Sequence, residues 1–152
     1  MQFIEAPYYP KTFGLPAVYL GGDEGEWDWQ KELDKMLLDV KKGTLFSSYT
    51  PDKIAPESQS RWDYIFSWSS PYLAFWFHKP ILPAKAMYIL GTQLVRYKLA
   101  KANIPKICIG IHPKCNHDFL TLQTTLLAKE LVIVDSLDKI KEWIEKEMAG
   151  AE

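Results

Sequence analysis

The amino-acid sequence predicts a three-layer α/β fold, in which helices cover both faces of a parallel sheet. Short segments rich in β-branched and aromatic residues alternate along the chain with longer segments whose apolar residues recur at helical spacing. One short segment, YLAFWF at 72–77, is apolar throughout, as expected of a central strand covered on both faces. Alternating strands and helices are typical of parallel sheets with crossover connections.

We expect five strands and five helices in the body of the chain. The expected strands are 17–20, 44–47, 72–77, 106–111 and 131–134. The expected helices are about 27–41, 58–69, 84–102, 119–128 and a final helix that Asp135 or Ser136 caps. Trp62, Ile65 and Phe66 form the expected buried stripe of the second helix, which Pro71 stops. Residues 1–16 are expected to be an extended arm with an edge strand at 2–5, and 17–152 the domain itself.

Composition and charge exclude several classes of protein. The chain has 152 residues, enough for one domain with a substantial core, and six tryptophans. Its formal net charge of −1 gives no electrostatic reason to expect a nucleic-acid or membrane partner. Two cysteines do not make a disulfide framework, and the N-terminal residues lack the pattern of a signal peptide. A cytoplasmic location is therefore expected.

The segment Ala17 to Trp29, AVYLGGDEGEWDW, is the first candidate for a ligand site. It reads as a buried strand, a glycine turn at Gly21 and Gly22, and an acidic turn that leads into a helix. In open α/β folds, the loop after such a strand lies at the carboxyl edge of the sheet, where ligands bind. The acidic residues suit a helix N-terminus and would repel a phosphate group.

Four pieces of the sequence resemble the nucleoside 2-deoxyribosyltransferase-like family. VYLGG followed by WDWQ is similar to the opening strand and turn of that family, and QSRWD at 59–63 is similar to its Q-x-x-W-E/D helix. LAFWF at 73–77 and YILG at 88–91 are similar to its central strand and to its aromatic-Glu-Leu-Gly motif. SLDKI near the C-terminus also fits. The resemblance implies a flavodoxin-like sheet of five strands in the order 2-1-3-4-5, and a homo-oligomer that completes its sites.

The resemblance also implies chemistry at the N-glycosidic bond of a nucleoside-type ligand, with no cofactor. Cleavage of this bond passes through an oxocarbenium-like state, so a carboxylate must attack or stabilise the sugar carbon while a donor helps the base to leave. In the family, the Glu of the aromatic-Glu-Leu-Gly motif is that carboxylate, and here Ile89 takes its place. Pro71 also stands where the family commonly has Asp.

The remaining candidates for catalysis are Asp63, Tyr19 and Asp23. Tyr19 matches the tyrosine that assists the nucleophile in the family, and either carboxylate could replace the missing glutamate. As ligand-binding residues we expect Gly21, Gly22, Trp27, Trp76, His78, Ile89 and Asn116. Simpler interpretations are also open. Tyr19 and Trp76 could be core residues, and Asp63 could be a solvated residue on a helix.

Three histidines and one cysteine follow predicted strands: His78, His112, Cys115 and His117. Transition metals accept these ligand types, but the spacing matches no established zinc pattern, and we expect no metal. The outer face of the 84–102 helix, with Tyr88 and Arg96, is a candidate subunit interface, since Tyr and Arg are favoured there.

Three functions stay open at this point. The first is an enzyme that transfers or hydrolyses a deoxyribosyl group. The second is a catalytically inactive module that binds a nucleoside or nucleotide derivative, which Ile89 favours. The third is a metal-dependent hydrolase that uses the histidine loops.

Overall fold

The computed structural model describes residues 1–152 except 26, 50–53, 116, 129–130 and 151–152. Its strands all run parallel in a single sheet, in the order β1-β3-β2-β4-β5-β6. The strands are β1 (Gln2–Glu5), β2 (Ala17–Gly22), β3 (Thr44–Ser47), β4 (Tyr72–Phe77), β5 (Lys106–Ile111) and β6 (Val132–Val134). The helices are α1 (Trp29–Met36), α2 (Pro56–Ser69), α3 (Ala84–Leu99), α4 (Asp118–Leu127) and α5 (Leu137–Ala149).

The predicted α/β class is confirmed, but the sheet has six strands, and its order therefore differs from the predicted five-strand order. The additional strand is β1, which pairs with β3 at one edge of the sheet. The edge strand expected at 2–5 is thus present, and it forms part of the main sheet. Without β1, the remaining strands follow the order β3-β2-β4-β5-β6, with the first of them in the chain, β2, between β3 and β4.

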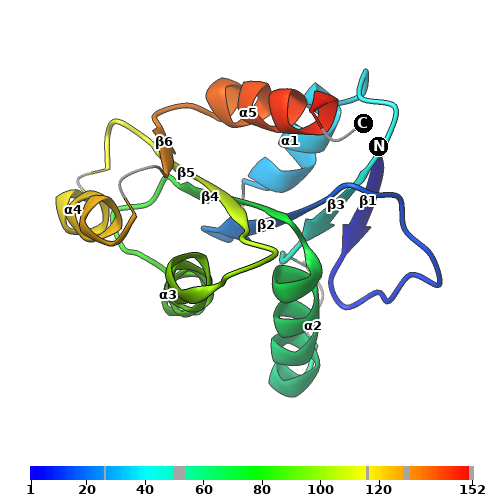
Figure 1. The fold of residues 1–152 in the computed structure, drawn as a ribbon, viewed down its shortest axis with the longest axis horizontal. Coiled ribbons are helices and arrows are strands. Elements are labelled where there is room, and N and C mark those ends of the chain that lie inside the picture. The colour runs from blue at the N-terminus through cyan, green and yellow to red at the C-terminus, as the bar shows by residue number, and fades with distance from the viewer. Residues whose placement is uncertain (26, 50–53, 116, 129–130, 151–152) are drawn as a thin grey trace.

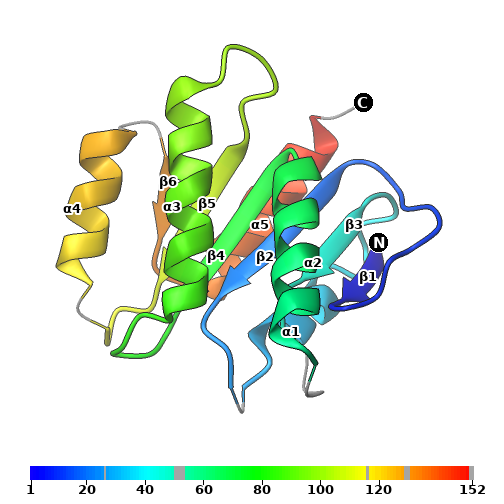
Figure 2. The ribbon, with the colours of Figure 1, turned by 90° about the horizontal axis from the view of Figure 1, so that it is seen from below.

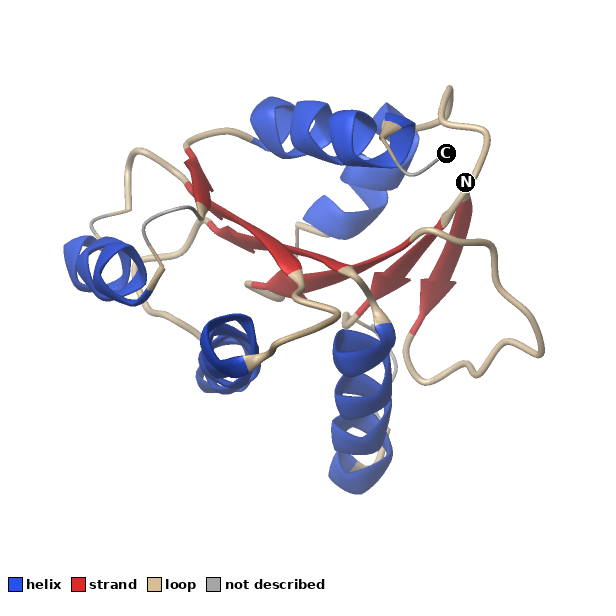
Figure 3. Ribbon diagram, viewed as in Figure 1, coloured by secondary structure: helices blue, strands red, loops and turns tan. Residues whose placement is uncertain are grey.

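Helices cover both faces of the sheet, as Figure 1 shows. Helices α1 and α5 lie on one face, and α2, α3 and α4 lie side by side on the other (Figures 1 and 2). Figure 3 shows the same three layers coloured by secondary structure. Within the described residues, no helix has both the length and the apolar character needed to cross a bilayer.

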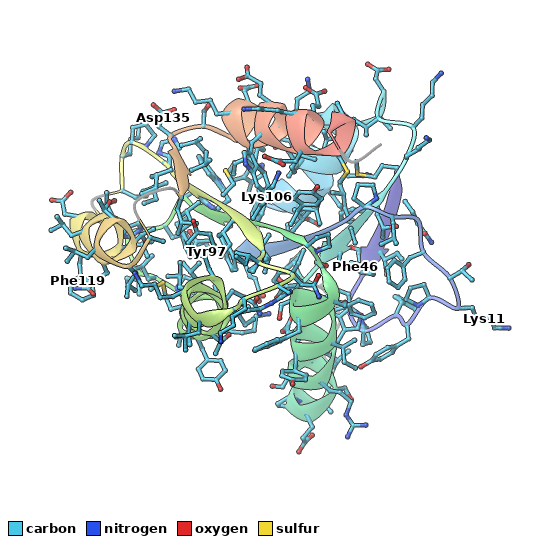
Figure 4. The ribbon with its side chains drawn as sticks, in the orientation of Figure 1. Lys11, Phe46, Tyr97, Lys106, Phe119 and Asp135 are labelled. Atoms are coloured by element: carbon cyan, nitrogen blue, oxygen red, sulfur yellow. The ribbon has the colours of Figure 1, made fainter. Side chains whose placement is uncertain are left out.

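The two faces of β2 belong to two separate apolar cores. Ala17 and Tyr19 pack into the core beneath α2 and α3, whereas Val18 and Leu20 pack into the core beneath α1 and α5. This alternation follows from the two-residue period of a strand. Phe46 of β3 is labelled in Figure 4 and lies on the α2 side, where its ring stacks on that of Phe66 with centroids 4.2 Å apart. The candidate site below is built on the α2 side of β2.

Several predicted boundaries were wrong. Helix α1 is shorter than predicted because Val40 N–H donates to the carbonyl of Leu37 at 3.0 Å, a turn that returns the chain toward β3. Helix α3 ends before residue 102, and Asn103 adopts a left-handed conformation with φ of 54°. In α2, Ile65 is 39% exposed, and the buried residues are Trp62, Asp63, Phe66 and Ser67. The buried face of α2 is therefore rotated toward Asp63.

The glycine pair lies inside strand β2 and not in a turn after it. Gly21 and Gly22 pair with Phe75 and Trp76 of β4. A Cβ at Gly22, whose φ is +137°, would lie 2.2 Å from the carbonyl oxygen of Trp76. Only glycine allows both this conformation and this approach. The pair therefore serves strand packing, which the sequence pattern could not distinguish from a ligand-binding turn.

Replacing Gly22 by alanine should destabilise the protein strongly. We expect the free energy of unfolding to fall by about 3 kcal/mol, from backbone strain and from the clash with Trp76. The measurement is urea denaturation at neutral pH.

Gly91→Ala is the matched control, with the opposite expected sign. Gly91 lies inside α3, and a Cβ there would meet no atom within 4 Å. Alanine should therefore raise the free energy of unfolding by about 0.5–1 kcal/mol, through its better helix propensity. Equal effects of the two substitutions would contradict the packing role of Gly22.

Candidate functional site

A pocket of about 480 Å³ lies between α2 and α3, on the face of the sheet that carries Tyr19. Both helices begin near the carboxyl ends of the strands (Figure 2). The residues that line the pocket run along α2 from Ser60 to Trp68 and along the first half of α3. Aromatic, hydroxyl and charged side chains and one aliphatic side chain line it: Ser60, Asp63, Tyr64, Ser67, Trp68, Lys85, Tyr88, Ile89 and Thr92. This is the size and the mixed character of a site for a small organic ligand.

Asp63 is the carboxylate of this pocket. It is only 3% exposed, and the Tyr19 hydroxyl donates to its Oδ1 at 2.9 Å. Gln59, one turn earlier on α2, donates from Nε2 to Oδ2 at 3.0 Å. A buried carboxylate needs such partners to offset its lost hydration. Tyr19, Gln59 and Asp63, which the sequence places in two separate motif pieces, thus form one hydrogen-bonded group.

Burial controls the proton affinity of this group. Loss of hydration raises the pKa of Asp63, although Lys85 and the hydrogen bonds from Gln59 and Tyr19 oppose the rise. Burial also raises the pKa of Tyr19 well above its usual range, and the neighbouring Asp63 adds to this rise. Tyr19 therefore stays protonated, and its hydroxyl donates a hydrogen bond to Asp63. A carboxyl group with a raised pKa is a common feature of catalytic sites.

Lys85 supplies the positive charge of the pocket. Its ammonium group forms an ion pair with Glu24, lies 3.8 Å from Oδ2 of Asp63, and donates to the carbonyl of Ser48 at 3.4 Å. It therefore links α3 to the segments that follow β2 and β3. The sequence analysis did not select Lys85 or Glu24. The sequence does contain a signal for Lys85. It precedes Ile89 by one helical turn, so both side chains are expected on the same face of α3.

Ile89 lines the same pocket as Asp63 and is 8% exposed. In the family that the sequence resembles, a catalytic glutamate occupies the corresponding position. An isoleucine side chain offers only apolar contact there. The pocket therefore contains one carboxylate on α2 and an apolar group at the position on α3 where the family has its acid.

Asp23 lies outside this pocket and connects two loops. Its Oδ2 accepts hydrogen bonds from the backbone N–H groups of His78 and Lys79, both at 2.6 Å, and its own N–H donates to the carbonyl of Trp76 at 2.9 Å. The side chain is 1% exposed. These contacts hold the loop after β2 against the loop after β4. They assign Asp23 to the structure of this edge, away from the Asp63 pocket.

The other residues predicted to bind ligand fall into different places. Trp76 is buried on the opposite face of the sheet, in the core beneath α1 and α5. Trp27 packs edge-on against His78, with ring centroids 4.8 Å apart. Burial lowers the pKa of His78, and Asp23 opposes this effect. Asn116 lies outside the described residues. Of the predicted ligand-binding residues that the structure describes, Ile89 lines the pocket.

The loops that carry the histidines lie against each other, but their described residues form no metal site. His117 Nε2 lies 2.8 Å from the carbonyl oxygen of Lys79, and the His112 ring packs edge-on against Trp76. Cys115 is partly exposed, and burial raises the pKa of its thiol. Over the described part of the chain, no three His, Cys, Asp or Glu side chains are placed to hold a metal ion.

No family model and no curated protein matches the chain. A solved structure, that of a conserved protein from Enterococcus faecalis V583, is similar in fold, with a TM-score of 0.62. The two sequences are 15% identical, and the match covers 86% of this chain and 98% of the other. This similarity concerns the fold alone.

Removing the Asp63 carboxylate should change how stability depends on pH. Because its pKa is raised in the folded state, the folded protein binds more protons than the unfolded chain above the ordinary Asp pKa of about 3.9. The free energy of unfolding of the native protein should therefore fall, relative to that of Asp63→Asn, as pH rises from there through the raised pKa. Urea denaturation between about pH 3.5 and 7 measures this difference.

Asp135→Asn is the control for this experiment. Asp135 is exposed, and Lys139 lowers its pKa. The free energy of unfolding of the native protein should therefore not fall, relative to that of Asp135→Asn, as pH rises. A pH-independent difference between the native protein and Asp63→Asn would contradict the raised pKa of Asp63.

Asp23→Ala should destabilise the protein, although it changes no residue that lines the pocket. The N–H groups of His78 and Lys79 would lose their acceptor, and we expect a loss of about 2–3 kcal/mol in the free energy of unfolding. Asp23→Asn keeps one acceptor oxygen and should lose less. Equal stability of the native protein and Asp23→Ala would contradict the linking role.

Proposed function

We propose that this protein binds a nucleoside-type ligand in the pocket between α2 and α3 and acts on its N-glycosidic bond, with Asp63 as the carboxylate. One observation carries the proposal. Tyr19, Gln59, Asp63 and Ile89 come from three separate motif pieces of the family resemblance. Asp63 and Ile89 line the pocket, and Tyr19 and Gln59 donate hydrogen bonds to Asp63.

The arrangement suits the charge that develops during glycosidic cleavage. A carboxylate beside the sugar carbon stabilises the oxocarbenium-like state or attacks it. The Tyr19 hydroxyl and Gln59 amide fix both carboxylate oxygens, so Asp63 is oriented before the ligand arrives. The exposed rings of Tyr64, Trp68 and Tyr88 at the rim offer apolar surface on which a planar base can pack.

A second candidate function is binding without turnover. Both oxygens of Asp63 already accept hydrogen bonds, and Oδ2 also lies near Lys85, which reduces the nucleophilicity of the carboxylate. Ile89 leaves the family's acid position apolar. These two observations favour a module that holds a nucleoside derivative but does not cleave it.

The first test is incubation of the purified protein with mixed deoxynucleosides and free bases, followed by chromatography for exchanged nucleosides or released base. If Asp63 is catalytic, Asp63→Asn should reduce the rate by about 100-fold or more, because the charge that stabilises the transition state is lost. Asp135→Asn, which removes an exposed carboxylate, should leave the rate unchanged.

Ile89→Glu distinguishes the two candidates. Turnover that appears only in this variant, together with nucleoside-dependent thermal stabilisation of the native protein, would support the binding module. If the native protein and Ile89→Glu both show no turnover and no nucleoside-dependent stabilisation, the nucleoside proposal is overturned.

A further inference from the structure

We propose that Gln30 is a positioning residue for the Asp63 pocket and that it acts through Ser48. Gln30 lies on α1, which covers the opposite face of the sheet from the pocket helices α2 and α3 (Figure 1). As a positioning role for a catalytic carboxylate, this inference rests on the proposed function. Its test measures Asp63 without any ligand, so the two proposals can fail separately.

The side-chain amide of Gln30 is buried and uses its whole hydrogen-bonding capacity. Its Nε2 donates to the carbonyl of Leu20 at 3.3 Å and to the hydroxyl of Ser48 at 3.4 Å. Its Oε1 accepts from the Tyr49 N–H at 3.1 Å and from the hydroxyl of Ser47. An amide offers two donor hydrogens and two acceptor lone pairs, and all four are engaged here. Gln30 therefore fixes three consecutive residues at the point where the chain leaves β3.

The middle one of these three residues, Ser48, holds two partners of Asp63 through its backbone. The Ser48 carbonyl accepts from Gln59 Nε2 at 3.0 Å and from Lys85 Nζ at 3.4 Å. The same Nε2 of Gln59 donates to Oδ2 of Asp63, and the ammonium group of Lys85 lies near that oxygen. The position of the Ser48 carbonyl therefore determines where an amide and an ammonium group stand relative to Asp63.

The hydroxyl of Ser48 reaches Asp63 by a second route, through Tyr19. Burial raises the pKa of Tyr19, and a hydrogen bond with the Ser48 hydroxyl opposes this rise. Because the Ser48 hydroxyl accepts from Gln30, its own hydrogen can be donated to the Tyr19 oxygen, which donates in turn to Oδ1 of Asp63. In such a chain each hydrogen bond polarises the next. Both oxygens of Asp63 are thus connected to Gln30 through the one residue Ser48.

The neighbours that Gln30 positions all act on the proton affinity of Asp63 in the same direction. Burial raises the pKa of Asp63, whereas Lys85, Gln59 and Tyr19 lower it. Glu24, which faces the same carboxylate, adds to the rise. Loss of the positioning contacts should therefore raise this pKa further, because the favourable neighbours are no longer held in place.

Carboxyl-carbon NMR of the ligand-free protein measures this effect, because it follows the titration of Asp63 itself. Gln30→Met keeps a side chain of similar length but forms none of the four hydrogen bonds. We expect it to raise the pKa of Asp63 by about 0.5 pH units or more. Ser48→Ala is a milder variant, which removes the hydroxyl but keeps the carbonyl. It should change the pKa in the same direction by a smaller amount, and it keeps the proposal testable if Gln30→Met does not fold.

Gln93→Met is the matched control, because Gln93 is also 0% exposed and lies on the pocket side of the sheet, on α3. Its amide bonds Ser67 and Arg96 rather than Ser48. This variant should lower the free energy of unfolding, as any loss of buried hydrogen bonds does, but leave the titration of Asp63 unchanged. An Asp63 pKa that keeps its native value in whichever of Gln30→Met and Ser48→Ala fold would overturn the proposal. So would an equal rise in Gln93→Met, since loss of stability alone would then explain the effect.

Discussion

The close approach of β2 to β4 at Gly22 is the constraint on which the carboxyl edge of these two strands depends. With no Cβ at this position, the backbone of β2 can follow β4 to the end of the strand and adopt a positive φ there. The chain then turns so that Asp23 reaches the N–H groups of His78 and Lys79. The loops after two neighbouring strands are thereby joined at the edge of the sheet where parallel α/β folds bind ligands.

The alternation of side chains along β2 and β4 separates the functions of the two faces. Tyr19 and Phe75 point toward α2 and α3, and Trp76 points toward α1 and α5. The α2 side thus receives the hydroxyl that bonds Asp63, together with the pocket. The α5 side is filled by Trp76, and a Cβ at Gly110 would lie 2.4 Å from its ring. Strand β2 therefore supplies Tyr19 to the candidate site on one face of the sheet, while the other face is closely packed.

Two carboxylates, those of Glu24 and Asp63, share one ammonium group, that of Lys85. Glu24 and Lys85 form an ion pair, and Asp63 is shared among Tyr19, Gln59 and the more distant Lys85. Such sharing keeps a buried carboxylate tolerable and holds its geometry, but it also occupies the lone pairs that a nucleophile would use. The same contacts that make Asp63 a candidate for catalysis thus support the alternative of binding alone.

The sequence by itself determined the α/β class and the position of most elements, and it selected Tyr19 and Asp63, which the structure joins by a hydrogen bond. Apolar periodicity and motif spacing are local properties, and YLAFWF at 72–77 or the stripe around Trp62 can be read without knowing their neighbours. Only the tertiary structure decided that β1 joins the sheet, that Gly22 packs against Trp76, and that Asp23 binds backbone rather than the pocket. Only the tertiary structure brought Lys85 and Glu24 to Asp63. These outcomes depend on contacts between segments far apart in the chain, and such contacts leave no periodic signal in either segment.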